Sequence, residues 1–132
     1  MANGTIAFDT LSTSGQISGT AKSVDADYLA YGSAKMWVNF DGTGTIASRD
    51  SFNLSSLADN GTGDYTATFT NAMGNANHAP QGVGQNSAST GLGLMYNPFS
   101  VTTTNTQMKY VNNDAAARDS GQNHVLTNGD LA

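Results

Sequence analysis

The chain has 132 residues and a net charge of −5 at pH 7, and it contains no Cys. That length suits one domain, and the lack of Cys excludes disulfides and thiolate metal sites. The basic residues are scattered and form no track for phosphate groups, which argues against nucleic acid as a partner. No apolar run approaches the roughly 20 residues of a membrane-spanning helix, so we expect no membrane insertion.

Small polar residues dominate the composition. Ser, Thr, Asn and Gly account for 58 residues, whereas Leu, Ile, Val and Phe account for 22. All ten acidic residues are Asp, which favours turns, and none is Glu, which favours helices. We therefore expect a turn-rich β protein whose thin core is completed by other copies of the chain. A homo-oligomer is favoured over an independently stable monomer.

Residues 1–34 are expected to form an N-terminal segment that anchors the protein to a partner. The first residues lack the basic and apolar regions of a secretory leader, which predicts synthesis in the cytoplasm. Residues 4–8 alternate weakly, as a strand would, and residues 25–31 form the best candidate for a helical turn. Gly32 then follows where a helix C-cap is expected.

Residues 35–70 carry the clearest signal, because two copies of one turn sequence lie between β-type runs. These are Asp41-Gly42-Thr43-Gly44 and Asn60-Gly61-Thr62-Gly63. Asp-Gly and Asn-Gly favour type I′ hairpin turns, in which both central residues take positive φ. The pattern predicts a core antiparallel meander, whose candidate turn residues are Asp41, Gly42, Gly44, Asn60, Gly61 and Gly63.

Alternation along the first run of this meander separates a core face from an outer face. One face carries Met36, Val38 and Phe40. Trp37 points the other way and needs cover of its own, from a neighbouring subunit, from the N-terminal segment or from a ligand.

The later runs of the meander alternate in the same manner. Tyr65, Ala67 and Phe69 oppose a row of threonines, and Leu57 leaves the phase that Phe52 and Leu54 set. Such a break indicates a β-bulge or the end of the strand. Five aromatic residues of the meander are the candidates for an interface between copies: Trp37, Phe40, Phe52, Tyr65 and Phe69.

Residues 71–91 form a polar stretch rich in Gly, Ala and Asn, which we expect to be a loop or else an irregular pair of strands. Residues 92–132 are expected to supply C-terminal strands and a tail. Strands are predicted around 92–96, 99–103 and 108–111. Val125 and Leu126 are expected either to join the sheet late or to reach a partner.

The chain carries no recognisable catalytic motif. His78 and His124 lie in polar sequence and are expected at the surface, and no Gly-x-Ser-x-Gly elbow is present. With ten Asp some carboxylate pair is inevitable, so a pair has no diagnostic value. We predict that the protein is not an enzyme and has no catalytic residue, cofactor or bound metal. Exposed aromatic residues such as Trp37 could stack on sugar rings, although burial at an oligomer interface is favoured.

Three consecutive pieces of the central segment resemble a recurrent β module of tail fibres and other virion proteins of tailed bacteriophages. They are residues 37–45 (Trp-Val-Asn-Phe-Asp-Gly-Thr-Gly-Thr), 49–57 (Arg-Asp-Ser-Phe-Asn-Leu-Ser-Ser-Leu) and 59–66 (Asp-Asn-Gly-Thr-Gly-Asp-Tyr-Thr). The resemblance covers residues 35–73. The remainder of the chain matches less well, and the shaft and attachment region of long fibres are not evident.

The resemblance implies a β-rich, trimeric and non-enzymatic virion protein that is made in the host cytoplasm. We accordingly expect one all-β domain, an antiparallel meander within a small sandwich or barrel. It would assemble as a homotrimer with extended N- and C-terminal segments, and its partners would be other virion proteins and a host surface glycan. The leading function is a fibre-like or tail-associated structural protein for assembly and host attachment. The alternatives are a capsid decoration or short head-fibre protein, and a free carbohydrate-binding domain.

Overall fold

The computed structural model describes residues 16–18, 23–85 and 93–132 of the chain, with side chains from residue 27 onward. The strand expected at residues 4–8 lies outside the described residues. The first described elements are β1 (Gln16–Ser18) and β2 (Ser23–Asp25), which pair as a two-stranded antiparallel sheet. A short helix, α1 (Ala26–Gly32), follows and ends at Gly32, which confirms the predicted helical turn. No helix among the described residues is long and apolar enough to cross a membrane.

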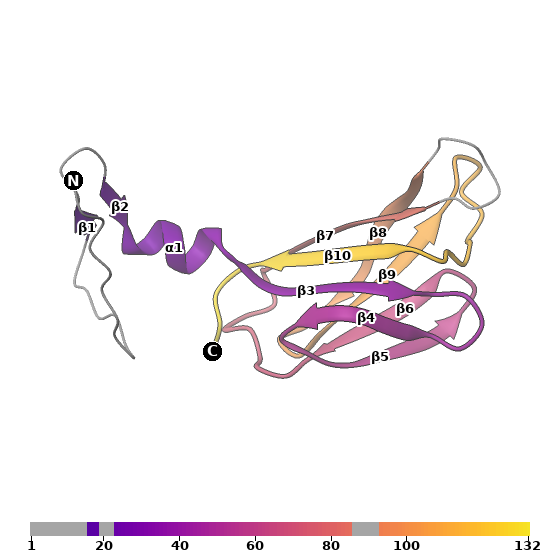
Figure 1. The fold of residues 1–132 in the computed structure, drawn as a ribbon, viewed down its shortest axis with the longest axis horizontal. Coiled ribbons are helices and arrows are strands. Elements are labelled where there is room, and N and C mark those ends of the chain that lie inside the picture. The colour runs from indigo at the N-terminus through magenta and orange to yellow at the C-terminus, as the bar shows by residue number, and fades with distance from the viewer. Residues whose placement is uncertain (1–15, 19–22, 86–92) are drawn as a thin grey trace, which may run out of the picture.

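Eight further strands within the described ranges form one antiparallel sheet. They are β3 (Ala34–Asp41), β4 (Ala47–Phe52), β5 (Leu54–Gly61), β6 (Asp64–Phe69), β7 (Ala79–Gln85), β8 (Gly93–Val101), β9 (Asn105–Val111) and β10 (Asn123–Asn128). Their order in the sheet is β4-β3-β10-β7-β8-β9-β6-β5, and the sheet curls into a nearly closed barrel (Figure 1). The predicted all-β class is confirmed. Strands β7, β8 and β9 follow one another as hairpins and β10 returns beside β7, which is a Greek key.

The core lies inside this barrel and is built by the alternation predicted for β3 and β6. Met36, Val38 and Phe40 of β3 are all at most 1% exposed, and so are Tyr65 and Ala67 of β6. Aromatic rings fill the centre: the centroids of Phe40 and Tyr65 lie 5.2 Å apart in an edge-to-face arrangement, and Tyr65 and Tyr110 lie 6.1 Å apart. As predicted, Trp37 faces away from this core.

The meander expected over residues 35–70 is only partly correct. The hairpins β3–β4 and β5–β6 are present, but β4 and β5 lie at opposite ends of the strand order and form no ladder with each other in the described sheet. Asn53 separates them with a φ of 56°. Its side chain accepts a hydrogen bond from the backbone N–H of Asn71 (2.7 Å) and donates to the carbonyl of Lys35 (2.9 Å). Asn53 therefore links the two margins of the curled sheet at the corner where the chain passes between them.

The corner at Asn53 also separates its two neighbours. Phe52 is 52% exposed, whereas Leu54 packs against the core, so these residues do not share the face that the sequence predicted. The bulge expected near Leu57 is confirmed by a register shift between Leu54 and Ser56 in the β5–β6 ladder.

The expectation of a loop across residues 71–91 is wrong for its middle, where β7 pairs with both β10 and β8. The strand is hard to recognise because Gly82 and Gly84 occupy positions that large rings cover. A Cβ at Gly82 would lie 2.7 Å from Cδ2 of Tyr96, and one at Gly84 would lie 2.8 Å from Cδ1 of Tyr110. The glycines leave room for aromatic side chains of β8 and β9, so β7 has no apolar periodicity of its own.

The C-terminal part of the chain completes the sheet. The strands predicted at 92–96 and 99–103 correspond to the single strand β8, which passes Pro98 with a register shift. Val125 and Leu126 do join the sheet, and their strand β10 lies between β3 and β7. The chain's last regular strand therefore sits beside the first strand of the barrel (Figure 1).

Candidate binding surface

The most distinctive surface of the protein lies on the outside of the barrel over β4, β3, β10 and β7. Two rows of outward residues cross these strands. In the first row Trp37 is paired with Phe52 on one side and Leu126 on the other, and Leu126 is paired with Gln81. In the second row Asn39 is paired with Asp50 and His124, and His124 is paired with Val83. Directly paired residues have Cβ atoms about 5 Å apart, so each row is a chain of neighbours.

The two rows enclose a hollow of about 560 Å³, which we call the Trp37 hollow. Seven outward residues line it: Trp37, Asn39, Asp50, Gln81, Val83, His124 and Leu126. Its size lies in the range of small-molecule sites, and it combines an apolar side with several polar groups, as such sites do.

The polar groups of the hollow have hydrogen-bonding capacity to spare. Within the described ranges, the side chains of Gln81 and His124 have no hydrogen-bond partner. Asp50 accepts one hydrogen bond, from the backbone N–H of Ser51 at 2.8 Å. Asn39 receives only a long contact of 3.5 Å from Arg49. Amide, imidazole and carboxylate groups therefore remain free to donate to and accept from a ligand.

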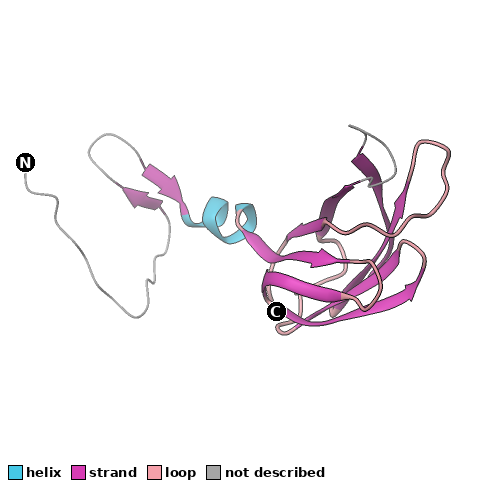
Figure 2. Cartoon of the chain, turned by 45° about the vertical axis from the view of Figure 1, so that its right-hand side comes forward, coloured by secondary structure: helices cyan, strands magenta, loops and turns pink. Residues whose placement is uncertain are grey.

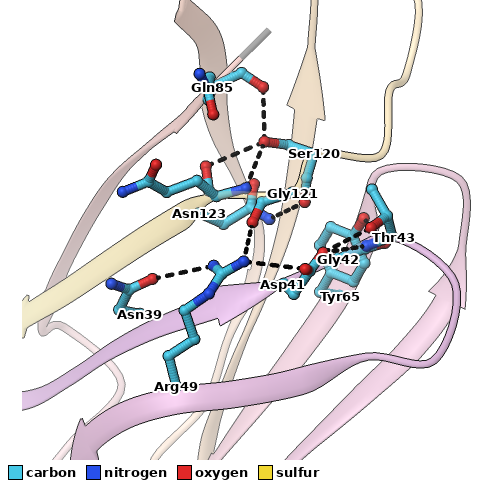
Figure 3. Close-up of polar contacts among 11 residues, drawn as sticks. Asn39, Asp41, Gly42, Thr43, Arg49, Tyr65, Gln85, Ser120, Gly121 and Asn123 are labelled. Carbon is cyan, nitrogen blue, oxygen red and sulfur yellow. Dashed lines mark hydrogen bonds and ion pairs between the residues drawn. The ribbon is translucent and has the colours of Figure 1, made fainter. Parts of the chain in front are cut away.

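One end of this surface is fixed by a polar network at the end of the barrel (Figure 3). The guanidinium of Arg49 contacts a carboxylate oxygen of Asp41 at 2.9 Å and also donates to the carbonyl of Gly121. The other carboxylate oxygen of Asp41 accepts hydrogen bonds from the hydroxyl and the backbone N–H of Thr43, at 2.7 and 2.9 Å. These hydrogen bonds, and the charge of Arg49, hold the pKa of Asp41 below its ordinary value.

The same network continues toward the core. The Tyr65 hydroxyl donates to the carbonyl of Gly42 at 2.9 Å and lies 2.9 Å from Asp119 Oδ1. Burial, followed by the hydrogen bond to Asp119, raises the pKa of Tyr65 far above its ordinary value. Asn123 donates to the carbonyl of Ser120 at 2.8 Å, and Ser120 in turn donates to the carbonyl of Gln85 (Figure 3). The network therefore joins loops at one end of the barrel, and its role is structural.

The five aromatic interface candidates fall into two groups. Phe40, Tyr65 and Phe69 lie in the core, at most 5% exposed, so their side chains pack inside the barrel. Trp37 and Phe52 are paired neighbours on the outer surface. Alternation placed Trp37 correctly, but sequence alone gave no reason to pair it with Phe52.

The turn candidates lie at the ends of the two hairpins. Asp41 ends β3 and the residues 42–46 form the loop to β4, whereas Asn60 and Gly61 still belong to β5 and the turn comes at Thr62 and Gly63. Neither copy is the expected type I′ turn at Asp-Gly or Asn-Gly, because positive φ occurs at Gly44, Gly61 and Gly63 and not at Asp41, Gly42 or Asn60.

The two histidines have different surroundings. His124 is exposed, as expected, and lines the Trp37 hollow. The expectation of a surface position is wrong for His78, which is 7% exposed, packs edge-on against Phe69 and contacts the carbonyl of Thr102 through Nε2 at 2.9 Å. In the described ranges, no three His, Asp, Glu or Cys side chains are gathered so as to hold a metal ion.

No family model, no curated protein and no solved structure matches this chain. Of the seven outward lining residues, sequence reasoning singled out only Trp37, and those it missed include Gln81, Val83 and His124. They are brought to Trp37 by the β3–β10–β7 ladders, and no local pattern in the chain encodes the register of these ladders.

Proposed function

We propose that this protein is a non-enzymatic structural protein of a bacteriophage particle, which acts as a homo-oligomer, with a trimer favoured. Its role is assembly and host attachment in a fibre-like or tail-associated position. The resemblance of residues 35–73 to a virion β module supports the proposal that the protein is part of a phage particle. The barrel supports a rigid scaffold role, since the polar network around Asp41, Tyr65 and Ser120 joins loops at the barrel end.

The proposal of a homo-oligomer rests on the exposed apolar side chains of α1. This helix has seven residues, and the exposed fractions of Tyr28, Leu29 and Tyr31 are 76%, 48% and 55%. Helices shorter than about 12 residues are marginal on their own and gain most of their stability from packing an apolar face. The exposed side chains of α1 therefore call for a surface that one copy of the barrel does not provide.

The position of α1 suits contact with another copy. Asn128 donates a hydrogen bond to the carbonyl of Gly32 at 3.0 Å, and the Ser33 hydroxyl donates to the carbonyl of Leu29 at 2.7 Å. These bonds fasten the end of the helix next to the start of β3. Figure 2 draws α1 beyond the end of the barrel, and an arm placed there can pack against a neighbouring arm or barrel. Several such copies would bind a host surface multivalently through individually weak contacts.

The oligomer is tested by measuring the mass of the full chain in solution by light scattering at micromolar concentration. The wild type should have the mass of about three chains. Tyr28→Ser combined with Tyr31→Ser removes two neighbouring apolar side chains of α1 and should give monomers. Met95→Ser is the matched control, because Met95 is 54% exposed on the barrel and its loss should leave the mass unchanged. A wild-type monomer would refute the oligomer.

The protein could occupy the tail, as proposed, or decorate the capsid surface. A label attached to the protein and counted in purified particles separates these two positions, because hundreds of copies indicate capsid decoration and a few dozen or fewer indicate the tail. Absence of the protein from particles would refute the virion role altogether.

A further inference from the structure

We propose that the Trp37 hollow is a binding site for a neutral pyranose sugar. This inference deepens the attachment role proposed above and rests on it, because it names the host-surface chemistry that the barrel would recognise. The site is a shallow, open one on the outer face of four strands, and we expect weak affinity per copy.

The first argument is the aromatic platform. Trp37 lies between Phe52 and Leu126 in the ladder, so its indole is flanked by apolar side chains along the row. One face of a pyranose carries several C–H groups with partial positive charge, which stack favourably on the negative face of an aromatic ring. Leu126 and Val83 extend the apolar side of the hollow.

The second argument is the set of polar groups beside this platform. Asn39, Asp50 and His124 lie in the row next to Trp37, and Gln81 ends the row of Trp37 itself. Sugar hydroxyls both donate and accept, and they are well matched by amides and a carboxylate that have spare donors and acceptors. An apolar helix from a second copy would bury these groups without partners, at a cost for each one. A hydroxyl-rich ligand satisfies them, and this favours a sugar over a second copy.

The third argument is charge, which selects among sugars. Among the described residues that line the hollow, Asp50 is the only carboxylate and none is a Lys or an Arg. The guanidinium of Arg49 reaches the lining residue Asn39 at 3.5 Å, but it is paired with the carboxylate of Asp41 and also donates to the carbonyl of Gly121. The chain as a whole carries −5. Sialic acid, uronic acids and phosphorylated sugars would meet the Asp50 carboxylate, and the one guanidinium that contacts a lining residue is already paired with Asp41, so the site favours a neutral ligand.

The chain offers a direct probe, because Trp37 is its only Trp. The full-length protein is titrated with the methyl glycosides of glucose, galactose, mannose and N-acetylglucosamine, and with glucuronic acid, while Trp fluorescence is recorded. At least one neutral glycoside should give a saturable change, and glucuronic acid should give none. If every neutral glycoside fails to give a saturable change, or if glucuronic acid binds as well as they do, the proposal is overturned.

Variants then locate the site by saturation-transfer NMR on the sugar, which does not depend on Trp. Asn39→Ala and Gln81→Ala should each weaken binding about three- to tenfold, the loss expected for one hydrogen bond. Trp37→Ala should abolish it. Phe99→Ala is the control, because Phe99 is 62% exposed outside the hollow and its loss should change nothing. Unchanged binding in both Asn39→Ala and Gln81→Ala would overturn the site.

The outcome is separable from that of the proposed oligomer. Fluorescence of Trp37 that changes with protein concentration and not with sugar would mean that a second copy fills the hollow, which contradicts the sugar site. The Tyr28→Ser and Tyr31→Ser variant should become monomeric yet keep the same sugar affinity per chain. A wild-type monomer that binds sugar would refute only the oligomer, and a wild-type oligomer that binds no neutral glycoside would refute only the sugar site.

Discussion

The two copies of the turn sequence share three of their four residues and fold differently. At Asp41-Gly42-Thr43-Gly44 the strand β3 ends at the first residue, and the Asp41 side chain caps the loop through Thr43. At Asn60-Gly61-Thr62-Gly63 the strand β5 continues through the second residue, and Gly63 completes the turn with a φ of 64°. Identical glycines thus stand at different points of the two hairpins.

What distinguishes the copies is the surface that each glycine meets. In the first copy Gly42 lies against the ring of Tyr65: a Cβ there would be 2.4 Å from the hydroxyl oxygen. Gly44 has a φ of 62° but nothing within 4 Å. In the second copy Gly63 has nearly the same φ as Gly44, and a Cβ there would lie 2.7 to 2.9 Å from backbone atoms of Tyr110 and Arg118. Tertiary contact, and not the turn sequence, decides which glycine is indispensable.

The largest effect is expected for Gly63→Ala. An alanine at this φ is strained by about 1–2 kcal/mol, and contact with backbone atoms that cannot move adds a further cost of about 1–3 kcal/mol. We expect the free energy of unfolding to fall by about 3 kcal/mol in urea titration at fixed protein concentration. Gly44→Ala is the matched control, because it carries the same φ in open space and should cost only about 1 kcal/mol. Equal losses in the two variants would contradict the role of the contact.

Gly42→Ala should come next, at a cost of about 1–3 kcal/mol, because it overpacks the core against Tyr65 without any backbone strain. Combination with Tyr65→Phe tests the cause. Removing the hydroxyl removes the nearest of the clashing atoms, so the double variant should be more stable than the sum of the two single losses predicts. Strict additivity of the two substitutions would mean that the loss of stability in Gly42→Ala does not come from contact with the Tyr65 hydroxyl.

The contrast between the copies also marks how far local sequence patterns reach. Alternation predicted β3 and β6 because each has one apolar and one polar face, and it placed Trp37 on the outer face. It missed β7 because the interior beside Gly82 and Gly84 is filled by Tyr96 and Tyr110 from other strands. When the core side chains beside a strand come from neighbouring strands, the strand's own sequence shows no apolar periodicity.

For a related reason, the sequence could not predict the Trp37 hollow or the closure of the barrel. Trp37, His124 and Gln81 are brought together by strand register, which follows from the packing of the whole sheet. The role of Asn53 depends in the same way on Lys35 and Asn71, which approach it only when the sheet curls. Sequence reasoning therefore identified the aromatic platform of the candidate site but not its polar side.

The smallest expected effect is the pH dependence of the stability that Asp41 contributes. Asp41, the first residue of its turn, can titrate, whereas Asn60 at the same place in the other copy cannot. The pKa of Asp41 is lowered in the folded state, so the unfolded chain binds the proton more readily as the pH falls. The stability that Asp41 contributes is present above the ordinary carboxyl pKa near 4 and is lost as the pH falls through the lower, folded value. Asp41→Asn should therefore lower the melting temperature at pH 6, and its difference from wild type should shrink toward pH 2.

The cause can be resolved by following the Asp41 carboxyl carbon through an NMR pH titration. The Thr43 hydroxyl makes the largest contribution to the lowered pKa, ahead of the Thr43 backbone N–H and of Arg49. Thr43→Ala should therefore raise the pKa of Asp41 more than Arg49→Ala does. The reverse order would mean that the ion pair, and not the capping hydrogen bonds, holds the first turn, and the proposed contrast between the two copies would then lie in the charge of Arg49.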